Sequence, residues 1–581
     1  MTDPGTDLSA RRFAVGLVLV LLIAALFRVA FPSADPPWRA TVGIVWHDEG
    51  AWVHNARNKA LFGSWSLDAW NPMYIAPVFT GLEYTAFKFL GVGLRQARLP
   101  SEILGWCSVV LLALGVRHIA GRAAGLAAAA LLATNFVYVM WNRTAMMEGP
   151  MAAFIVASWY CYVRAQSDAR WGWAAGLFAL AAFFTKAAAA FFVAALGLDA
   201  VLVLASGYAG LQSNPAERRA AITTLAGLTV VGIVALLAFV LPNWTEYRFY
   251  NWQMSVTRKP SYDLESLMNR VTWFPILHDV FTRMWAVLLI GTIAAFGLLA
   301  RWRSIGGGQR LLLLWVGLGS LELLLHDVGN ERRFVFLIPA FVALAAIALG
   351  SERRLLTPEA AAAPRRMAIL LLPLLGFAAY VVSGAIVRLA FIYEVSPNVR
   401  LAAAIAVVCC LVLIATWPRI PSALAGSRWS PAAGLTVALI VSAGHVGEYV
   451  QWAAGRTYRN YDASQAIGRA LPEGTLVHGK LANGLALENR IRPVFVGRGF
   501  GNYEDRQQRD DVRYILTYIE PYVGYEGRVI TDVLDAYPDR RTIMTFDVAE
   551  TTSGHDRAAL IDKFGTAPSR PPQPVDGRAH D

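Results

Sequence analysis

Two adjacent carboxylates, Asp48 and Glu49, follow the first apolar segment of the chain, with His47 before them and His54 shortly after. A carboxylate in such a place can take a proton from a hydroxyl or hold a divalent cation. Aspartate is also a favoured N-cap residue, so Asp48 could cap a short helix that begins at Glu49. The two interpretations are compatible. The histidines are weaker candidates, because a histidine more often makes a structural hydrogen bond.

Two more ionisable residues interrupt later apolar segments. Glu148 begins one of them, where the helix dipole alone would favour an acid. Lys186 lies in a run of alanines and phenylalanines, where an ionisable residue is costly unless it has a function or reaches the interface. An ammonium group there would suit a phosphate as a point charge. Arg143 could pair with Glu148 or contact a lipid phosphate.

A last charged cluster begins at Glu322, one helical turn before His326, and continues with Glu331, Arg332 and Arg333. Guanidinium groups make charge-assisted and often bidentate contacts with phosphate. The paired arginines therefore indicate a phosphate or diphosphate ligand.

The composition predicts which elements position these residues. The chain has 581 residues, of which 56% are hydrophobic and only 16% charged, and this balance is typical of a polytopic membrane protein. The net charge of +11 does not indicate nucleic acid, because the basic residues cluster in short loops between apolar runs. The four cysteines lie in apolar runs without metal-ligand spacing, so the sequence predicts neither a disulfide framework nor a zinc site.

Apolar runs of about 18 residues or more predict about thirteen transmembrane helices. The first, residues 13–31, lacks a convincing cleavage site and reads as a retained signal anchor. It is followed by an outer loop, 32–99, in which the stretch 72–93 predicts one or two helices at the membrane surface. The other predicted spans are 100–117, 122–141, 149–165, 171–186, 187–206, 220–241, 282–300, 311–327, 333–350, 367–387, 399–416 and 432–450.

Loop charges predict the orientation. With the N-terminus in the cytoplasm, the inner loops carry the basic residues and few acids, as the positive-inside rule requires. The protein would then lie in the plasma (inner) membrane with Asp48, Glu148, Lys186 and residues 451–581 outside. Arg332 and its neighbour depart from the rule, because they too would lie outside, and an anion ligand explains them better.

The C-terminal part changes character after residue 450. Short strand-like runs alternate with helix-like ones over 451–550 and predict a small extracytoplasmic α/β domain. The proline-rich stretch 551–581 predicts a disordered tail. The predicted helix is 462–471, and the predicted strands are 475–478, 493–496, 512–518 and 542–546.

The charged motifs, taken in order, resemble those of GT-C-fold glycosyltransferases of the protein O-mannosyltransferase and aminoarabinose (ArnT-like) transferase group. The motifs span about residues 10–350, and the architecture covers the whole chain. The matching stretches are 46–50 with 55–56, 71–91, 98–101, 143–148, 184–186, and His326 with 331–334.

The resemblance implies a GT-C-like catalytic domain over 1–450. It also implies inverting transfer of a sugar from a polyprenyl-phosphate donor to a hydroxyl of a lipid, protein or envelope glycan. Asp48 is then the candidate base, and Glu49 supports it. Glu148 is the second acid, although relatives often have aspartate there. The implied donor-phosphate contacts are Lys186, Arg332, Arg333 and Arg143, with Glu331, His326, His47 and His54 in support.

Two questions stay open at this stage. A tyrosine is common in relatives where Arg333 stands, so either arginine could face the phosphate. The sequence requires no metal, but Asp48, Glu49 or Glu148 would hold a divalent ion if one binds. The alternative function is a transporter or flippase of a lipid-linked sugar. The acidic residues argue against it, because they gather on one side of the membrane instead of at the midplane.

Overall fold

The computed structural model describes most of the chain, and the account below is confined to that part. The described ranges are 8–37, 47–206, 214–256, 262–267, 283–299, 301–326, 331–350, 430–495, 509–520, 537–549 and 556–565, with the single residues 404, 405, 408, 412 and 534.

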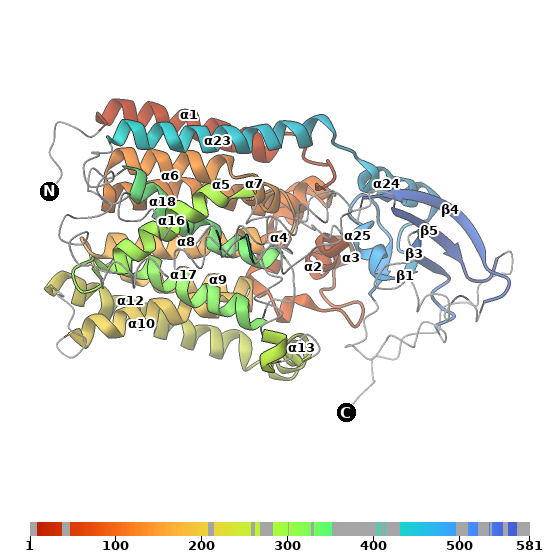
Figure 1. Ribbon diagram of the computed structural model, residues 1–581. Coiled ribbons are helices and arrows are strands. Elements are labelled where there is room, and N and C mark those ends of the chain that lie inside the picture. The colour runs from red at the N-terminus through yellow and green to blue at the C-terminus, as the bar shows by residue number, and fades with distance from the viewer. Residues whose placement is uncertain are drawn as a thin grey trace.

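A bundle of apolar helices forms the larger part of the molecule (Figure 1). Each predicted span inside the described ranges coincides with a helix, whereas 367–387 and 399–416 lie outside them except for isolated residues. The bundle helices are α1 (Ala10–Val29), α5 (Leu94–Ala120), α6 (Arg122–Thr134), α7 (Phe136–Asn142), α8 (Glu148–Ala165), α9 (Trp171–Thr185), α10 (Ala190–Leu204), α12 (Pro215–Ala235), α16 (Trp285–Leu299), α17 (Gly307–His326), α18 (Ile338–Gly350) and α23 (Pro431–Ala454).

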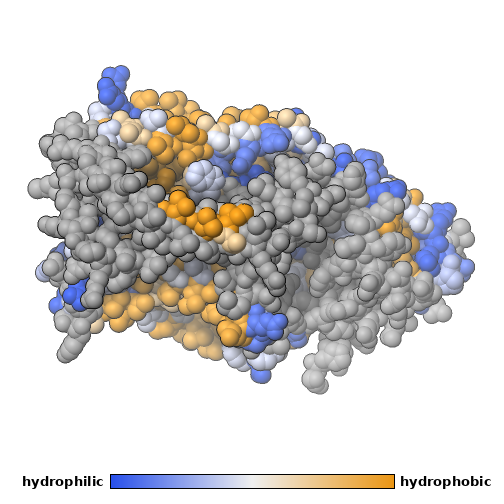
Figure 2. All heavy atoms as spheres, viewed as in Figure 1, coloured by the Kyte–Doolittle hydropathy of each residue, from blue (hydrophilic) through white to orange (hydrophobic). Residues whose placement is uncertain are grey.

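By length and composition, seven helices of the described part can each cross a membrane. An eighth is added if α6 and α7, which meet at a 62° bend, form one broken span. The apolar helices α9 and α16 are shorter, with 15 residues each. In the view of Figure 2, hydrophobic residues predominate along the sides of the coloured part of the bundle, and hydrophilic residues gather at its ends and on the C-terminal domain. The prediction of a polytopic helical membrane protein is confirmed.

The two ends of the bundle sequence lie next to each other. Helices α1 and α23 run side by side (Figure 1), and the rings of Phe27 and Tyr449 stack with centroids 4.2 Å apart. Arg143 donates hydrogen bonds to the carbonyl oxygens of Phe27 and Arg28, in the last turn of α1, and to that of Phe31 just beyond the helix. The last turn of a helix leaves its carbonyl oxygens without helical partners.

The segment between α1 and α5, which the sequence predicts as an outer loop, contains several helices in its described part. It contains α2 (His47–Trp52), α3 (His54–Phe62), the 3₁₀ turn η1 (Pro72–Tyr74) and α4 (Pro77–Leu90), which agrees with the helices predicted over 72–93. A separate helix, α13 (Trp244–Val256), packs on this loop, since the Tyr250 hydroxyl donates to the Ala69 carbonyl oxygen at 2.7 Å.

The C-terminal domain is a small α/β unit at one end of the bundle (Figure 1). Helix α24 (Arg459–Ala470) and the short helix α25 (Lys480–Gly484) accompany a sheet in the strand order β2-β1-β3-β5-β4. Strand β1 is parallel to β2 and β3, and β5 is antiparallel to β3 and β4. The strands are β1 (Leu476–His478), β2 (Arg492–Val494), β3 (Tyr514–Glu520), β4 (Arg541–Val548) and β5 (Asp556–Asp562).

The predicted boundary of the disordered tail at residue 551 is wrong for residues 556–562, which form β5. This segment reads Asp-Arg-Ala-Ala-Leu-Ile-Asp and has little intrinsic strand preference. It is a strand because β3 and β4 pair with it on both sides, so the tertiary context overrides the local composition.

A buried ion-pair cluster holds the bundle far from the C-terminal domain. Arg310, near the start of α17, donates to Asp199 at 2.9 Å, and the Tyr162 hydroxyl donates to the other Asp199 oxygen at 2.6 Å. A second acid, Glu217, lies 3.8 Å from Arg310. Asp199 and Arg310 are both inaccessible to solvent, so each charge depends on its partners.

We therefore expect Asp199→Asn to lower the free energy of unfolding by about 3 kcal/mol, because it leaves the Arg310 charge buried with a single weak partner. Thermal unfolding in detergent measures this change. The control is Glu473→Gln, which breaks an exposed pair with Arg490 and should cost at most about 1 kcal/mol. Equal melting temperatures for both variants would contradict the expectation.

Candidate functional site

Asp48, the first acid of the pair, faces an arginine from a distant part of the sequence. Helix α2 presents Asp48, and the 3₁₀ turn η4 (Glu331–Leu337), which precedes α18, presents Arg332. The Arg332 guanidinium donates to the Asp48 carboxylate at 2.6 Å. Both side chains keep 12% of their surface exposed, so the pair is largely buried but still reachable.

A second ion pair adjoins the first. Lys186 stands at an extended break between α9 and the 3₁₀ turn η2 (Ala187–Ala189), and its ammonium group donates to a Glu148 carboxylate oxygen at the start of α8. The same Glu148 oxygen lies 3.7 Å from Arg332. The other Glu148 oxygen is buried and has no hydrogen-bond partner among the described residues.

These four residues form a continuous row, Asp48–Arg332–Glu148–Lys186, in which acids and bases alternate. Their formal charges cancel, which makes burial of the row tolerable. Each residue lies at or beside a helix end, and all four elements meet on the side of the bundle that the outer loop covers. The row is an arrangement of two cations and one accessible carboxylate next to an apolar bundle.

The second acid of the pair points elsewhere. The Glu49 carboxylate binds the Arg98 guanidinium with two hydrogen bonds, of 2.9 and 2.8 Å, and also accepts one from the Ala145 amide at 2.8 Å. Arg98 in turn donates to the carbonyl oxygens of Pro32 and Ala34. Glu49 therefore ties α2 to the bundle and does not lie in the row with Asp48.

Glu83 is a buried acid that lies outside the charged motifs of the sequence. It lies in α4 with no exposed surface, and neither of its carboxylate oxygens has a hydrogen-bond partner among the described residues. Burial, together with the negative charge of Glu49, raises the pKa of Glu83 well above its ordinary value. The surroundings of Glu83 therefore favour the neutral form of its carboxyl group.

Several predicted donor-side contacts lie outside the row. The Arg143 guanidinium donates to carbonyl oxygens at the end of α1 and lies 4.7 Å from the Trp452 ring centroid. It therefore does not face Lys186. Arg333 donates to the His326 carbonyl oxygen, and the half-exposed His326 ring lies 3.7 Å from Glu322. The side chains of His47 and Glu331 lie outside the described residues.

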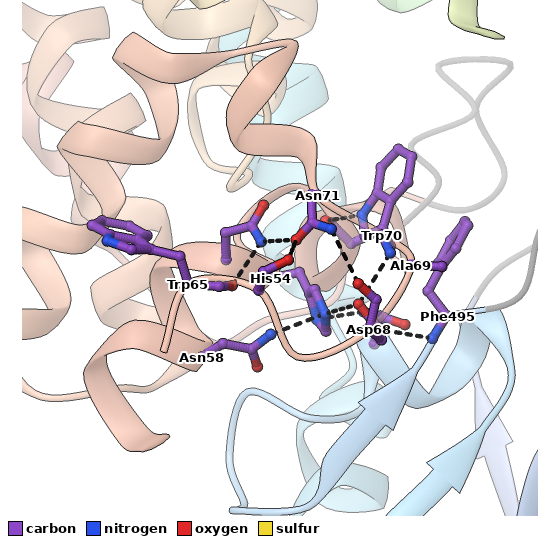
Figure 3. Close-up of polar contacts among 12 residues, drawn as sticks. His54, Asn58, Trp65, Asp68, Ala69, Trp70, Asn71 and Phe495 are labelled. Carbon is purple, nitrogen blue, oxygen red and sulfur yellow. Dashed lines mark hydrogen bonds and ion pairs between the residues drawn. The ribbon is translucent and has the colours of Figure 1, made fainter. Parts of the chain in front are cut away.

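His54 belongs to a buried network between the outer loop and the C-terminal domain (Figure 3). One ring nitrogen lies 2.9 Å from Asp68 and 3.0 Å from Asn58, and the other lies 3.0 Å from Asn483 of α25. Asp68 also accepts a hydrogen bond from the Phe495 amide at 3.0 Å. His54 is 1% exposed, so it joins two parts of the fold and does not face the row.

The described part of the chain contains no preformed group of metal ligands. No group of three or more histidine, cysteine, aspartate or glutamate side chains gathers there with a metal-binding geometry. The three acids considered from the sequence are directed to different cations, because Asp48 faces Arg332, Glu49 faces Arg98 and Glu148 faces Lys186.

Comparison with known proteins identifies related folds. A model of the family described as dolichyl-phosphate-mannose-protein mannosyltransferase matches residues 76–244, a segment that contains Glu148 and Lys186. No curated protein matches the chain. The structure of ArnT from Cupriavidus metallidurans bound to undecaprenyl phosphate is similar, with a TM-score of 0.52 and 16% identity over 97% of this chain and 100% of that one. Its apo state gives a TM-score of 0.52 with 15% identity over the same shares of the two chains.

The resemblance inferred from the charged motifs is confirmed by these matches, and the shared GT-C fold is shown over nearly the whole chain. At this level of identity the structural likeness establishes the fold alone. The roles of individual residues rest on the geometry described above.

The raised pKa of Glu83 has a measurable consequence. The unfolded chain ionises this group above a pKa of about 4.3, whereas the folded chain holds the proton more tightly, so wild-type stability falls as the pH rises from that value toward the folded-state pKa. We expect Glu83→Gln, which mimics the neutral acid, to remove this loss of about 1.4 kcal/mol per pH unit. The variant should therefore gain stability relative to wild type between pH 5 and pH 8. Melting temperatures in detergent at both pH values measure the gain, and a pH-independent difference would refute it.

Proposed function

We propose that this chain is a membrane glycosyltransferase that moves a sugar from a polyprenyl-phosphate donor to a hydroxyl acceptor, a function that the family match and the ArnT-like fold support. The observation that carries the proposal is the row Asp48–Arg332–Glu148–Lys186. It combines a carboxylate able to accept a proton with two cations able to receive a phosphate.

In the proposed reaction, an Asp48 carboxylate oxygen takes the proton of the acceptor hydroxyl. The hydroxyl oxygen attacks the anomeric carbon from the face opposite the phosphate, which inverts the configuration. The bond between the anomeric carbon and the phosphate oxygen breaks, and the polyprenyl phosphate leaves with the electron pair. Lys186 and Arg332 stabilise the negative charge that develops on the leaving phosphate.

Arg332 connects the two halves of this site. Its guanidinium lies at 2.6 Å from Asp48 and 3.7 Å from Glu148, so a donor phosphate that enters beside Lys186 competes with both acids for it. Movement of Arg332 toward the phosphate would release the Asp48 oxygen on which the proton arrives. Donor binding would in this way prepare the base before the acceptor reacts.

Glu148 holds the two cations in place. Its carboxylate is 1% exposed and receives Lys186 directly, and this arrangement prevents two buried positive charges from repelling each other in the resting protein. A water-poor site would also limit hydrolysis of the activated donor. The loop charges support a location on the outer face of the plasma membrane, with the N-terminus in the cytoplasm and the C-terminal domain outside. The acceptor is a lipid, a protein or an envelope glycan.

We expect Asp48→Asn to lower transfer about 10²- to 10⁴-fold, because the amide cannot accept the proton. Transfer is measured in proteoliposomes with an undecaprenyl-phosphate sugar donor, after mass spectrometry of a deletion strain has identified the accumulated donor and the missing product. Asp168→Asn, an exposed carboxylate in the loop between α8 and α9, is the matched control. Full activity of the Asp48 variant would refute the proposed base.

Lys186→Met tests the phosphate half of the site separately. Loss of a charge-assisted contact should weaken binding of undecaprenyl phosphate about 10-fold or more, since hydrogen bonds to charged groups contribute about 1.5–3 kcal/mol. The Asp48→Asn variant should bind the same lipid at least as tightly as wild type, because a neutral amide competes less with the phosphate for Arg332. Tight binding by the Lys186 variant, measured by scintillation proximity or native mass spectrometry, would place the phosphate elsewhere.

A further inference from the structure

The helix that presents Asp48 rests on the C-terminal domain by direct backbone contact. Helix α2 has six residues, and Gly50 lies two positions after Asp48. A Cβ atom on Gly50 would lie 1.8 Å from the carbonyl oxygen of Asn483, 2.4 Å from its carbonyl carbon and 2.9 Å from the Gly484 nitrogen. All three are backbone atoms of α25, so only glycine permits this approach.

A buried arginine joins the segments that follow these two elements, α3 after α2 and the stretch after α25. Arg57 of α3 is 1% exposed and donates to the carbonyl oxygens of Ala486 at 3.1 Å, Asn489 at 3.0 Å and Ile491 at 2.9 Å. These three acceptors follow α25 directly. The guanidinium fork of Arg57 thereby holds the segment after α25 against the outer loop.

Polar and aromatic contacts extend this interface beyond α2. His54 lies 3.0 Å from Asn483, and Asp68 accepts from the Phe495 amide (Figure 3). The rings of Trp70 and Phe495 stack with centroids 4.6 Å apart. The domain and the outer loop are therefore joined by buried contacts at several points, unlike a domain tethered by a linker.

The bundle positions Arg332, the partner of Asp48, whereas the C-terminal domain supports α2, the helix that presents Asp48. Arg332 belongs to the turn before α18, and Glu49 gives α2 one anchor on the bundle through Arg98. The next residue of α2, Gly50, lies against the backbone of Asn483 and Gly484. A displacement of about 1 Å in a reacting group can lower a rate about 10²-fold.

We propose that the C-terminal domain is a structural part of the catalytic centre, and that Gly50 and Arg57 are positioning residues that set the place of the Asp48 carboxylate. This inference rests on the proposed function. It assigns to the domain a task in the chemical step, carried by the α2–α25 contact, in addition to any contact with substrate.

The test is Gly50→Ala in the full-length protein, with Gly81→Ala as its control. Both substitutions add a methyl group to a helix of the outer loop, but a Cβ atom at Gly81 meets nothing within 4 Å. We expect Gly50→Ala to lower kcat for sugar transfer about 10²-fold and to leave KM for the undecaprenyl-phosphate donor within about threefold. Gly81→Ala should match wild type in both.

Arg57 supplies a second, independent variant. Arg57→Lys keeps the charge but loses the fork that reaches three carbonyl oxygens, so its kcat should fall between those of wild type and Arg57→Ala. Binding of undecaprenyl phosphate should be unchanged in all three proteins. An ordered series in kcat at constant donor affinity supports the positioning role.

Three outcomes distinguish failure of this inference from failure of the proposed function on which it rests. Absence of sugar transfer by the wild-type protein defeats the proposed function, and with it this inference. Transfer by wild type together with wild-type kcat in Gly50→Ala defeats the positioning role alone. Loss of donor binding in step with kcat also defeats it, because the contact would then serve the folding of the whole site.

Discussion

Burial of charge next to an apolar bundle is the constraint on which this structure depends. An isolated ion in such surroundings costs several kcal/mol, so each buried charge requires a partner. The fold meets this requirement with alternating acids and bases that come from distant parts of the chain. The row from Asp48 to Lys186 joins four elements, and the Glu49–Arg98 pair joins a fifth. The same interactions that make the charges tolerable bring the outer loop, α8, α9 and the turn before α18 to one place.

The adjacent acids Asp48 and Glu49 divide two tasks between them. Glu49 has three hydrogen bonds and almost no exposed surface, which suits an anchor. Asp48 pairs with Arg332 and keeps some access to solvent, so in the proposed mechanism a phosphate draws this partner away. Neighbouring residues on a short helix point in different directions, and this geometry separates the fixed carboxylate from the one that can change partners.

The sequence predicted the helices and the charged residues at their ends, because hydropathy and isolated charges in apolar runs are strong local signals. Side-chain direction is not such a signal, so the assignment of Glu49 to Arg98 and of Arg143 to the end of α1 could not be foreseen. Strand β5 escaped prediction because its neighbours in the sheet, and not its composition, make it a strand. Glu83 was visible only as a charge, since its burial depends on how α4 packs.

The contact between α2 and α25 also has a consequence for the synthesis and folding of the protein. His54 and Asn483 are 429 residues apart in sequence, and a chain is synthesised from its N-terminus. The bundle helices can assemble as they emerge, but the support beneath Asp48 does not yet exist at that time. The acid therefore reaches its final place only when nearly the entire polypeptide has been made. A prematurely terminated copy that ends after Arg332 but before residue 483 would carry every charged residue of the row and still lack the support beneath Asp48.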